Sequence, residues 1–278
     1  MLILGPPPKS LSERVEIMSS KKFARLITSI QQYDRVAVAY SGGVDSTLLL
    51  YAAKTALGPG KVVAFTMLSS LSPSYAVEKL RSVFLEHFLG EVEHKEINTD
   101  PLAWKEIVAN GSKRCYFCKK NMYSLLKDSM KGEDYYILFD GTNTDDIKED
   151  RPGLKAIRER GIKTPLLDVD LNKAEIRKIA KEIGLSNHDL PSNSCLATRV
   201  PTTRKIDKEI LKRINSAETY LLEMGFSGCR VRPIGSYAII EIQAADFDKI
   251  FHPARMNKIT SYFHSLSFDD VALSFTQR

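Results

Sequence analysis

The stretch from residue 36 to residue 53 constrains the fold more than any other part of the chain. Val36–Ala39 is an apolar, partly β-branched run, Gly42 and Gly43 lie in a polar turn, and residues 47–53 have the composition of a helix. A buried parallel strand, a tight loop and a helix N-terminus fit that order. The free N–H groups of a helix N-terminus attract anions, and two glycines let the backbone approach a ligand closely. We therefore expect an anion site on an α/β fold.

The loop itself reads Ser-Gly-Gly-Val-Asp-Ser at residues 41–46. It lacks the Gly-Lys-Ser/Thr ending of kinase-type and GTPase-type P-loops. It resembles instead the PP-loop of the ATP pyrophosphatase superfamily, whose members split ATP between the α and β phosphates and adenylate an acceptor. A carboxylate at Asp45 suits a magnesium ion that travels with the phosphates, because hard cations take oxygen ligands. The alternative is a Gly-Gly turn that opens an ordinary helix. We expect ATP and Mg²⁺ to be bound by Ala39, Ser41, Gly42, Gly43, Asp45 and Ser46.

Composition bounds the size and the setting of the protein. A chain of 278 residues with 43% hydrophobic content can bury a sizeable core and has room for two domains. No apolar run approaches the roughly 18 residues that span a bilayer. The Pro-rich N-terminus does not have the layout of a signal peptide. We expect a cytoplasmic protein without a membrane partner. The net charge of +6 suits anionic ligands or RNA and selects neither.

Strand and helix signals alternate along residues 1–200, which predicts a parallel-sheet PP-loop domain with helices on both faces. The predicted strands are 35–39, 62–66, 91–97, 135–139 and 163–167. The predicted helices are 12–33, 47–57, 72–88, 113–130 and 172–183, the last capped by Asp170 or Asn172. Residues 201–278 are predicted to form a smaller α+β domain for substrate binding or oligomerisation. Its predicted elements are a helix at 206–224, a hairpin of 229–233 and 238–242, a helix at 247–265 and a strand at 271–275.

In a parallel sheet of this kind, ligands bind beyond the carboxyl ends of the strands. Thr66 ends the second predicted strand and is a candidate adenine contact. The polar loop 140–146 follows the fourth strand, so Gly141 is a further candidate for nucleotide binding. Asp145 and Asp146 in this loop are candidates for magnesium or ribose binding, and the alternative is a solvated acidic loop that caps a helix.

Three of the four cysteines are predicted to converge. Cys115 and Cys118 lie on one face of a helix, and Cys195 lies in a polar loop that the fold places at the same sheet edge. Three thiolates suit a [4Fe–4S] cluster in which one iron has no protein ligand and could hold sulfide. The alternatives are a zinc site completed by another ligand, thiol chemistry with a persulfide on Cys195, and three unrelated buried cysteines. Cys229 lies in a predicted buried strand.

Basic residues accompany these motifs. Lys119 and Arg114 flank the cysteine pair and are candidates for holding phosphates or a developing oxyanion. Lys119 is placed among the catalytic candidates with Asp45 and the three cysteines. Arg230 and Arg232 lie on one face of a predicted strand, and paired guanidiniums suit phosphate or carboxylate. The alternative is a solvated strand face with salt bridges. Arg199, close to Cys195, favours an anionic second substrate.

Together these motifs resemble one branch of the superfamily, the LarE-type sulfur transferases that mature the nickel-pincer nucleotide cofactor. The resemblance spans nearly the whole chain and rests on residues 39–47, 119–124, 151–156, 194–199 and 230–232. It implies that ATP adenylates a carboxylate of pyridinium-3,5-biscarboxylic acid mononucleotide, releasing pyrophosphate, and that sulfur then displaces AMP to give a thiocarboxylate. It also implies that four residues lie near the phosphate or carboxylates of this substrate, namely Arg199, Glu218, Arg230 and Arg232. Asp246 or Asp248 would match a further acid of the family.

The family has two chemistries. In one, a single cysteine at the position of Cys195 gives up its own sulfur and becomes dehydroalanine. In the other, three cysteines hold a [4Fe–4S] cluster that relays sulfide. This sequence has cysteines at all three positions and so resembles the cluster type. The resemblance also implies a homo-oligomer, in known cases a hexamer built from trimers, and sulfide or another sulfur donor as a partner.

Other functions remain open from the residues alone. A tRNA thiolase of the same superfamily can also use three cysteines and a [4Fe–4S] cluster. The chain has no spare cysteine pairs of the kind that bind zinc in such thiolases, so a nucleic-acid partner is not expected. A non-catalytic protein that senses ATP or iron is a third possibility. Glutamine-dependent amidation is set aside because the chain has no glutaminase half.

Overall fold

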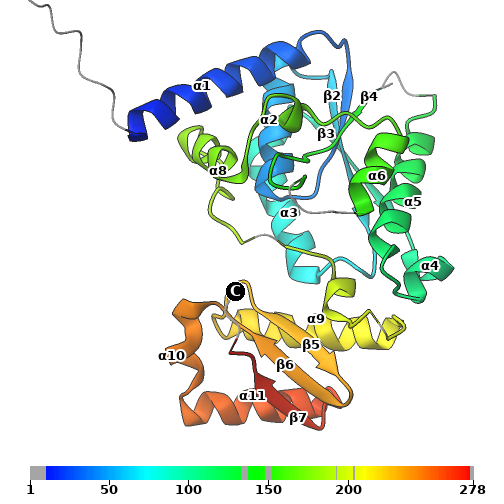
Figure 1. Cartoon of the computed structure of the whole chain (residues 1–278), viewed down its shortest axis with the longest axis vertical. Helices are drawn as coiled ribbons and strands as arrows, with labels where there is room; N and C mark the ends of the chain where they lie inside the picture. The colour runs from blue at the N-terminus through cyan, green and yellow to red at the C-terminus, as the bar shows by residue number, and fades with distance from the viewer. Residues whose placement is uncertain (1–10, 133–136, 148–151, 192, 203, 276–278) are drawn as a thin grey trace, which may run out of the picture.

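The computed structural model describes residues 11–132, 137–147, 152–191, 193–202 and 204–275. Its larger sheet has four parallel strands in the order β3-β2-β1-β4 (Figure 1). They are β1 (Val36–Ala39), β2 (Val62–Leu68), β3 (Glu93–Asn98) and β4 (Ile137–Phe139). The predicted α/β class and four of the predicted strands are confirmed, although residues 135 and 136 of the fourth lie outside the described residues. The strand that leads into the Gly-Gly loop is an interior strand.

Side chains of β1 and β2 alternate between two buried clusters. One cluster lies under α1 (Leu11–Ile30), α2 (Val44–Leu57), α3 (Ser74–Phe88) and α8 (Lys173–Glu182) and includes Val36, Val38, Val62 and Ala64. The other lies under α5 (Arg114–Ser129) and α6 (Pro152–Glu159) and includes Ala37, Val63 and Phe65. Burial on both faces explains why these strands read as continuous apolar runs.

The predicted fifth strand at 163–167 is wrong. Lys163 forms only an isolated parallel bridge to Phe139, and α7 (Pro165–Asp168) follows directly. Pro165 lies in the first turn of this helix, where its missing N–H is not needed and its fixed φ favours helix. The apolar run therefore continues as a helical turn, with Leu166 in the core below α2.

A second sheet has three strands in the order β5-β6-β7. β5 (Arg230–Ile234) and β6 (Tyr237–Glu241) form the predicted antiparallel hairpin, and β7 (Asp270–Leu273) pairs with β6 in parallel. The sheet shares a buried cluster with α9 (Lys208–Glu223) and α11 (Pro253–Ser265). Figure 1 shows these elements grouped apart from the four-stranded sheet. The assignment of 1–200 and 201–278 to separate domains stays a prediction.

The predicted helix at 247–265 is interrupted. η3 (Ala244–Asp246) and α10 (Phe247–Ile250) come first, and α11 begins only at Pro253. A proline lacks the N–H for a helical bond and disfavours helical backbone in the residue before it, so the chain breaks at His252. The helical spacing of the apolar residues did not reveal this break.

The two sheets are joined through the segment that contains η2 (Leu196–Arg199). A buried apolar cluster surrounds it and contains Leu71 before α3, Ile107 of α4 (Lys105–Val108), and Ile210 and Ile214 of α9. Short η1 (Pro101–Ala103) precedes α4. Within the described residues, no helix combines the length and apolar character needed to cross a membrane.

Candidate active site

The Gly-Gly loop joins β1 to α2 at the carboxyl edge of the larger sheet, directly after Ala39, the last residue of β1. The backbone N–H of Ser41 donates to Oγ of Ser46 at 3.2 Å, and the two hydroxyls lie 3.1 Å apart. Oγ of Ser46 donates to the carbonyl of Gly43 at 3.0 Å. These bonds fold the loop over the first turn of α2, with the amino end of the helix next to it.

Two glycines allow close packing at this helix end. Gly42 has φ +71°, and a β-carbon there would lie 2.6 Å from Cβ of Leu80. A β-carbon on Gly141, in the loop after β4, would lie 3.1 Å from the backbone nitrogen of Ser46. Gly141 therefore packs closely against Ser46 at the start of α2, and Gly42 packs against Leu80 of α3, where a side chain would not fit without a shift.

Asp45, in the first turn of α2, carries an unusual carboxylate. Oδ2 forms a short ion pair with Nζ of Lys173, at the start of α8. Oδ1 is buried and has no hydrogen-bond partner among the described residues. Burial raises the pKa of Asp45 above its ordinary 3.8, and the Lys173 ammonium partly opposes that rise. A buried oxygen without a partner fits a site for a cation such as Mg²⁺.

Lys173 and Asn187 were missed from the sequence. Nδ2 of Asn187, a buried residue after α8, donates to the carbonyl of Gly42 and to Oγ1 of Thr47, each at 2.9 Å. Lys173 reaches Asp45 across 128 residues of sequence. The sequence did contain a signal for the position of Lys173. Asn172 and Glu175 form the capping box that starts α8, so Lys173 is the first residue of that helix. Asn187 had no such signal.

Thr66 is buried in β2 beside the start of the loop. Its Oγ1 donates to the carbonyl of Tyr40 at 2.9 Å and lies 2.8 Å from Nε2 of His94 on β3. The ring of His94 stacks on Phe84, with centroids 4.3 Å apart. Thr66 thus links the chain directly after β1 to the first residues of β3, and its predicted adenine contact stays a prediction.

The carboxylates of the acidic loop after β4 accept hydrogen bonds from backbone N–H groups. Oδ2 of Asp145 accepts from the backbone N–H of Lys173 at 2.7 Å, and Oδ2 of Asp146 accepts from that of Asn143 at 3.1 Å. Oδ1 of Asp140 accepts from the N–H of Thr142 at 2.9 Å. Such bonds are typical of carboxylates that cap turns and helix ends, the second of the two roles considered for this loop.

The three cysteines come from two elements. Cys115 and Cys118 lie in the first turns of α5, and Cys195 directly precedes η2. Farther along α5, Tyr123 donates a short hydrogen bond to Asp140, the first residue after β4. Cys118 is five residues nearer the helix start, about 7.5 Å along the axis at the usual rise. The pair therefore lies beyond the carboxyl edge of the sheet, as predicted from the order of elements.

The thiols interact with one another electrostatically. Burial raises the pKa of Cys118 to about 12; the thiols of Cys195 and Cys115 add to the rise, and Arg114 and Lys119 oppose it. Burial also raises the pKa of Cys195, which Arg114 lowers and Cys115 raises. Cys118 and Cys195 pack against the same apolar cluster. All three cysteines are free thiols, and Cys229 is a fourth, buried directly before β5 in the apolar cluster of the smaller sheet.

No group of three or more His, Cys, Asp or Glu side chains among the described residues is arranged to hold a metal ion. Thiolates that share one tetrahedral ion must lie about 3.8 Å apart, because Zn–S bonds are about 2.3 Å long. A four-iron cluster binds each thiolate through a different iron, so its thiolates can lie farther apart than those of a single ion. Three thiols are chemically suited to either kind of site, and the [4Fe–4S] cluster on Cys115, Cys118 and Cys195 stays a prediction.

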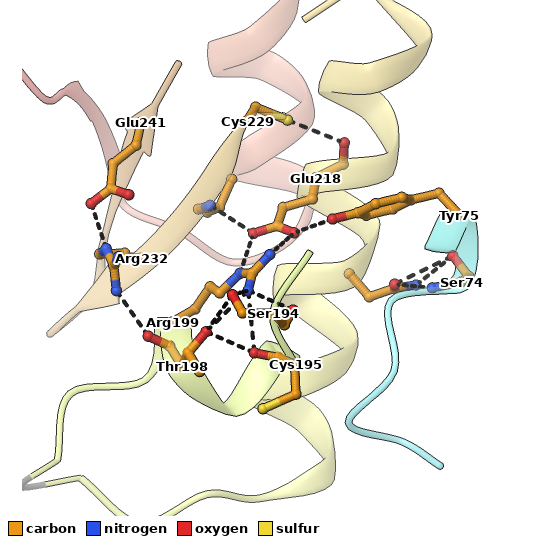
Figure 2. A network of polar contacts seen from close by, with 12 residues as sticks. Ser74, Tyr75, Ser194, Cys195, Thr198, Arg199, Glu218, Cys229, Arg232 and Glu241 are labelled. Carbon is orange, nitrogen blue, oxygen red and sulfur yellow. Dashed lines mark hydrogen bonds and ion pairs between the residues drawn. The ribbon is translucent and has the colours of Figure 1, made fainter. Parts of the chain in front are cut away.

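Lys119 and the two arginines of β5 differ in what they contact. The stem of Lys119 packs on α6, since a β-carbon on Gly153 would lie 2.9 Å from its Cδ. Arg232 pairs with Glu241 on β6, and its Nη1 donates to the carbonyl of Thr198 in η2 at 2.8 Å (Figure 2). Arg230 lies half-buried on the same face of β5.

Arg199 and Glu218 were predicted to bind substrate and lie buried against each other. The Glu218 carboxylate also accepts from Tyr75 Oη at 3.2 Å and from the Val231 backbone N–H at 2.9 Å (Figure 2). Nη1 of Arg199 donates to the carbonyl of Ser194 at 2.8 Å and to that of Cys195 at 3.2 Å. These contacts connect the Cys195 segment to α9, and the predicted substrate contact stays a prediction.

Asp246 and Asp248, the two candidates for a further family acid, differ in setting. Asp246 is buried, and its Oδ1 accepts from Nζ of Lys249 at 2.5 Å. Asp248 lies in the first turn of the short α10.

The parallel sheet with helices on both faces, and a glycine-rich loop between its interior strand and α2, define an α/β protein of Rossmann-like architecture. No protein-family model matches the chain. The chain is 32% identical over 256 residues to an uncharacterized protein of Synechocystis sp., covering 92% of this chain and 94% of the relative. An uncharacterized protein of Methanocaldococcus jannaschii is 29% identical over 257 residues, with coverage of 91% and 96%.

A third relative has a known name. The pyridinium-3,5-bisthiocarboxylic acid mononucleotide synthase of Lactiplantibacillus plantarum is 32% identical over 257 residues, which cover 92% of this chain and 91% of that enzyme. The chain belongs to the family of this synthase, the LarE family.

Proposed function

We propose that this protein is an ATP-dependent sulfur transferase that converts a carboxylate of pyridinium-3,5-biscarboxylic acid mononucleotide into a thiocarboxylate. The observation that carries the proposal is the position of two kinds of chemistry at one sheet edge. The Gly-Gly loop with Asp45 and Lys173 lies at the ends of β1 and β4, and the cysteine-bearing start of α5 lies beyond the end of β4. Family membership supports the choice of substrate.

The first step is activation of the carboxylate. Its oxygen attacks the α-phosphorus of ATP, the bond to the β-phosphate breaks, and pyrophosphate leaves with the electron pair. The amino end of α2 and the ammonium of Lys173 would stabilise the phosphate charge. Asp45 would hold Mg²⁺, which supplies positive charge to the departing pyrophosphate.

The second step exchanges oxygen for sulfur. A sulfide lone pair attacks the acyl carbon, and AMP leaves with the carboxylate oxygen and the electron pair. Cys115, Cys118 and Cys195 would hold a [4Fe–4S] cluster, which when bound supplies an iron with an open position for a deprotonated sulfide. Arg199 and Arg114 would keep the Cys195 segment in place through its backbone carbonyls.

The test separates the two steps. Purified protein is incubated anaerobically with ATP, Mg²⁺ and the pyridinium nucleotide, after reconstitution with iron and sulfide. We expect pyrophosphate release and a product whose mass shows an oxygen-to-sulfur exchange, with about four iron and four sulfide per chain. Cys195→Ala should keep pyrophosphate release and lose the thiocarboxylate, because activation does not need the thiol. Cys229→Ala is the matched control and should keep both.

Two results would contradict the proposal. If pyrophosphate release required Cys195, the division between activation and sulfur transfer would be wrong. If the protein released pyrophosphate with tRNA and not with the pyridinium nucleotide, it would be a tRNA thiolase.

A further inference from the structure

Asn110 is a buried residue in the turn between α4 and α5 with a left-handed backbone, φ +53°. Asn adopts this conformation more readily than most residues. Its Nδ2 donates to the carbonyls of Pro201 and Arg204, each at 2.8 Å, and lies 3.4 Å from that of Val200. One amide thus holds the chain that follows Cys195 and η2 against the chain that precedes Cys115.

Arg114, the first residue of α5, extends this contact to the thiols. Its Nη1 donates to Oδ1 of Asn110 in a short hydrogen bond and to the carbonyl of Ala197 at 2.9 Å. Its Nη2 lies 3.7 Å from Sγ of Cys115. A planar guanidinium can serve several acceptors at once in fixed directions. Arg114 therefore contacts one cysteine directly and holds the backbone two residues from another.

The charge of Arg114 acts in the same place. Its guanidinium lies beside the thiol of Cys115 and is hydrogen-bonded to the segment that follows Cys195. Metal ligation requires thiolates, and three thiolates close together repel one another. A fixed cation among the three thiols reduces that repulsion.

Two further backbone bonds determine where the Cys195 segment lies. The N–H of Leu196 donates to the carbonyl of Leu71 at 2.8 Å, and that of Ile206 donates to the carbonyl of Val108 at 3.0 Å. These bonds hold the two ends of the segment. Asn110 and Arg114 hold its middle, on the side that faces α5.

We propose that Arg114, oriented by Asn110, is a positioning residue that sets the distance between the cysteine pair of α5 and Cys195. This inference rests on the proposed function in one respect: the spacing matters for activity only if the three thiols act together. It does not rest on that function for its test, because thiol spacing is measurable in the reduced, metal-free protein.

The experiment cross-links thiols with dibromobimane, whose two arms each alkylate one thiol. Trypsin then releases Cys115 and Cys118 in peptide 115–119, or in peptide 114–119 when Arg114 is replaced, and Cys195 in peptide 182–199, so a linked pair is identified by mass. The variants are Arg114→Met, which removes the guanidinium, and Asn110→Gly, which keeps the left-handed backbone and removes the amide. Lys113→Met is the matched control, since it removes an exposed charge next to Arg114.

We expect the linked peptides in wild type and in Lys113→Met, and a several-fold lower yield in Arg114→Met and in Asn110→Gly. Iron and sulfide content after anaerobic reconstitution should fall in the same two variants. Phe263→Leu, in the core of the other sheet, serves as a variant that is less stable but should cross-link like wild type.

A wild-type yield in folded Arg114→Met would overturn the inference. So would a low yield in Phe263→Leu equal to that of Arg114→Met, because the effect would then follow stability and not position. If cross-linking depends on Arg114 but no pyrophosphate is released with the pyridinium nucleotide, the proposed function fails and the positioning role stands.

Discussion

Arg199 and Glu218 form a two-point ion pair inside the protein, with Nε–Oε1 at 2.8 Å and Nη2–Oε2 at 3.0 Å. Their side chains are 1% and 0% exposed. Each charge has further partners, which include Tyr75 of α3 and the backbone carbonyl of Ser194, just before η2. The pair therefore connects three parts of the chain that are distant in sequence: the start of α3, the Cys195 segment and α9.

Removing one partner of this pair should strongly destabilise the protein. Arg199→Met leaves the Glu218 carboxylate buried without its cation, and Glu218→Leu leaves the guanidinium unpaired, so each should lower the free energy of unfolding by about 3–5 kcal/mol. The double variant should lose less than the sum, because no lone charge remains buried. Urea denaturation measures all three. Single losses of only about 1 kcal/mol, typical of surface pairs, would contradict this account.

Asp45 should cost the protein stability near neutral pH. Burial raises its pKa in the folded state above 3.8, so the stability it contributes is present below that value and is lost as the pH rises through the folded pKa. Asp45→Asn should therefore raise Tm at about pH 7 in the absence of nucleotide and raise it less at about pH 4. The same variant should lose pyrophosphate release. An unchanged or lower Tm at neutral pH would show that the pairing with Lys173 outweighs the burial.

The two loop glycines should differ sharply when replaced. Gly42→Ala places a β-carbon 2.6 Å from Leu80 and forces alanine to φ +71°, so we expect a loss of about 2 kcal/mol or more in the free energy of unfolding. Gly43 has φ −73°, and its added β-carbon would meet only Oγ of Ser41 at 3.5 Å. Gly43→Ala should be nearly neutral and is the matched control. Equal effects of the two substitutions on chemical denaturation would contradict the loop geometry.

His94 should make the protein less stable in mild acid. Burial lowers its pKa below 6.5 in the folded state, so the unfolded chain binds more protons between the folded and unfolded pKa values. Stability therefore falls as the pH drops through that window. His94→Gln can keep a hydrogen-bond donor toward Thr66 but does not titrate. Its free energy of unfolding, measured by urea denaturation, should therefore fall less than that of wild type between about pH 8 and about pH 5.5. An identical pH dependence in both proteins would show that His94 is not responsible.

Much of the larger sheet could be predicted from the sequence because local patterns there agree with tertiary burial. Val36–Ala39 and Val62–Leu68 are apolar on both faces, and both are interior strands. The wrong elements occur where proline acts against that pattern. Pro165 starts a helix within an apparent strand, and Pro253 divides an apparent long helix.

The site was predictable where chemistry depends on neighbours in sequence. The contacts of Ser46 with Ser41 and Gly43 lie within the loop motif itself. Lys173 and Asn187 reach the loop from beyond α7, and no local pattern encodes such distances. The burial of Arg199 also escaped prediction, because a charged residue in a polar loop reads as solvent-exposed until the Glu218 carboxylate is placed opposite it.

On the side that faces α5, the segment after Cys195 is held through its main-chain atoms. The carbonyls of Ala197, Pro201 and Arg204 accept from Arg114 and Asn110, and the N–H groups of Leu196 and Ile206 donate to other backbone carbonyls. Peptide groups are present whatever side chain a residue carries. Exposed positions of this segment can therefore change in the course of evolution without moving the sulfur atom, whereas Asn110 and Arg114 cannot change so freely, since their side chains make the contact.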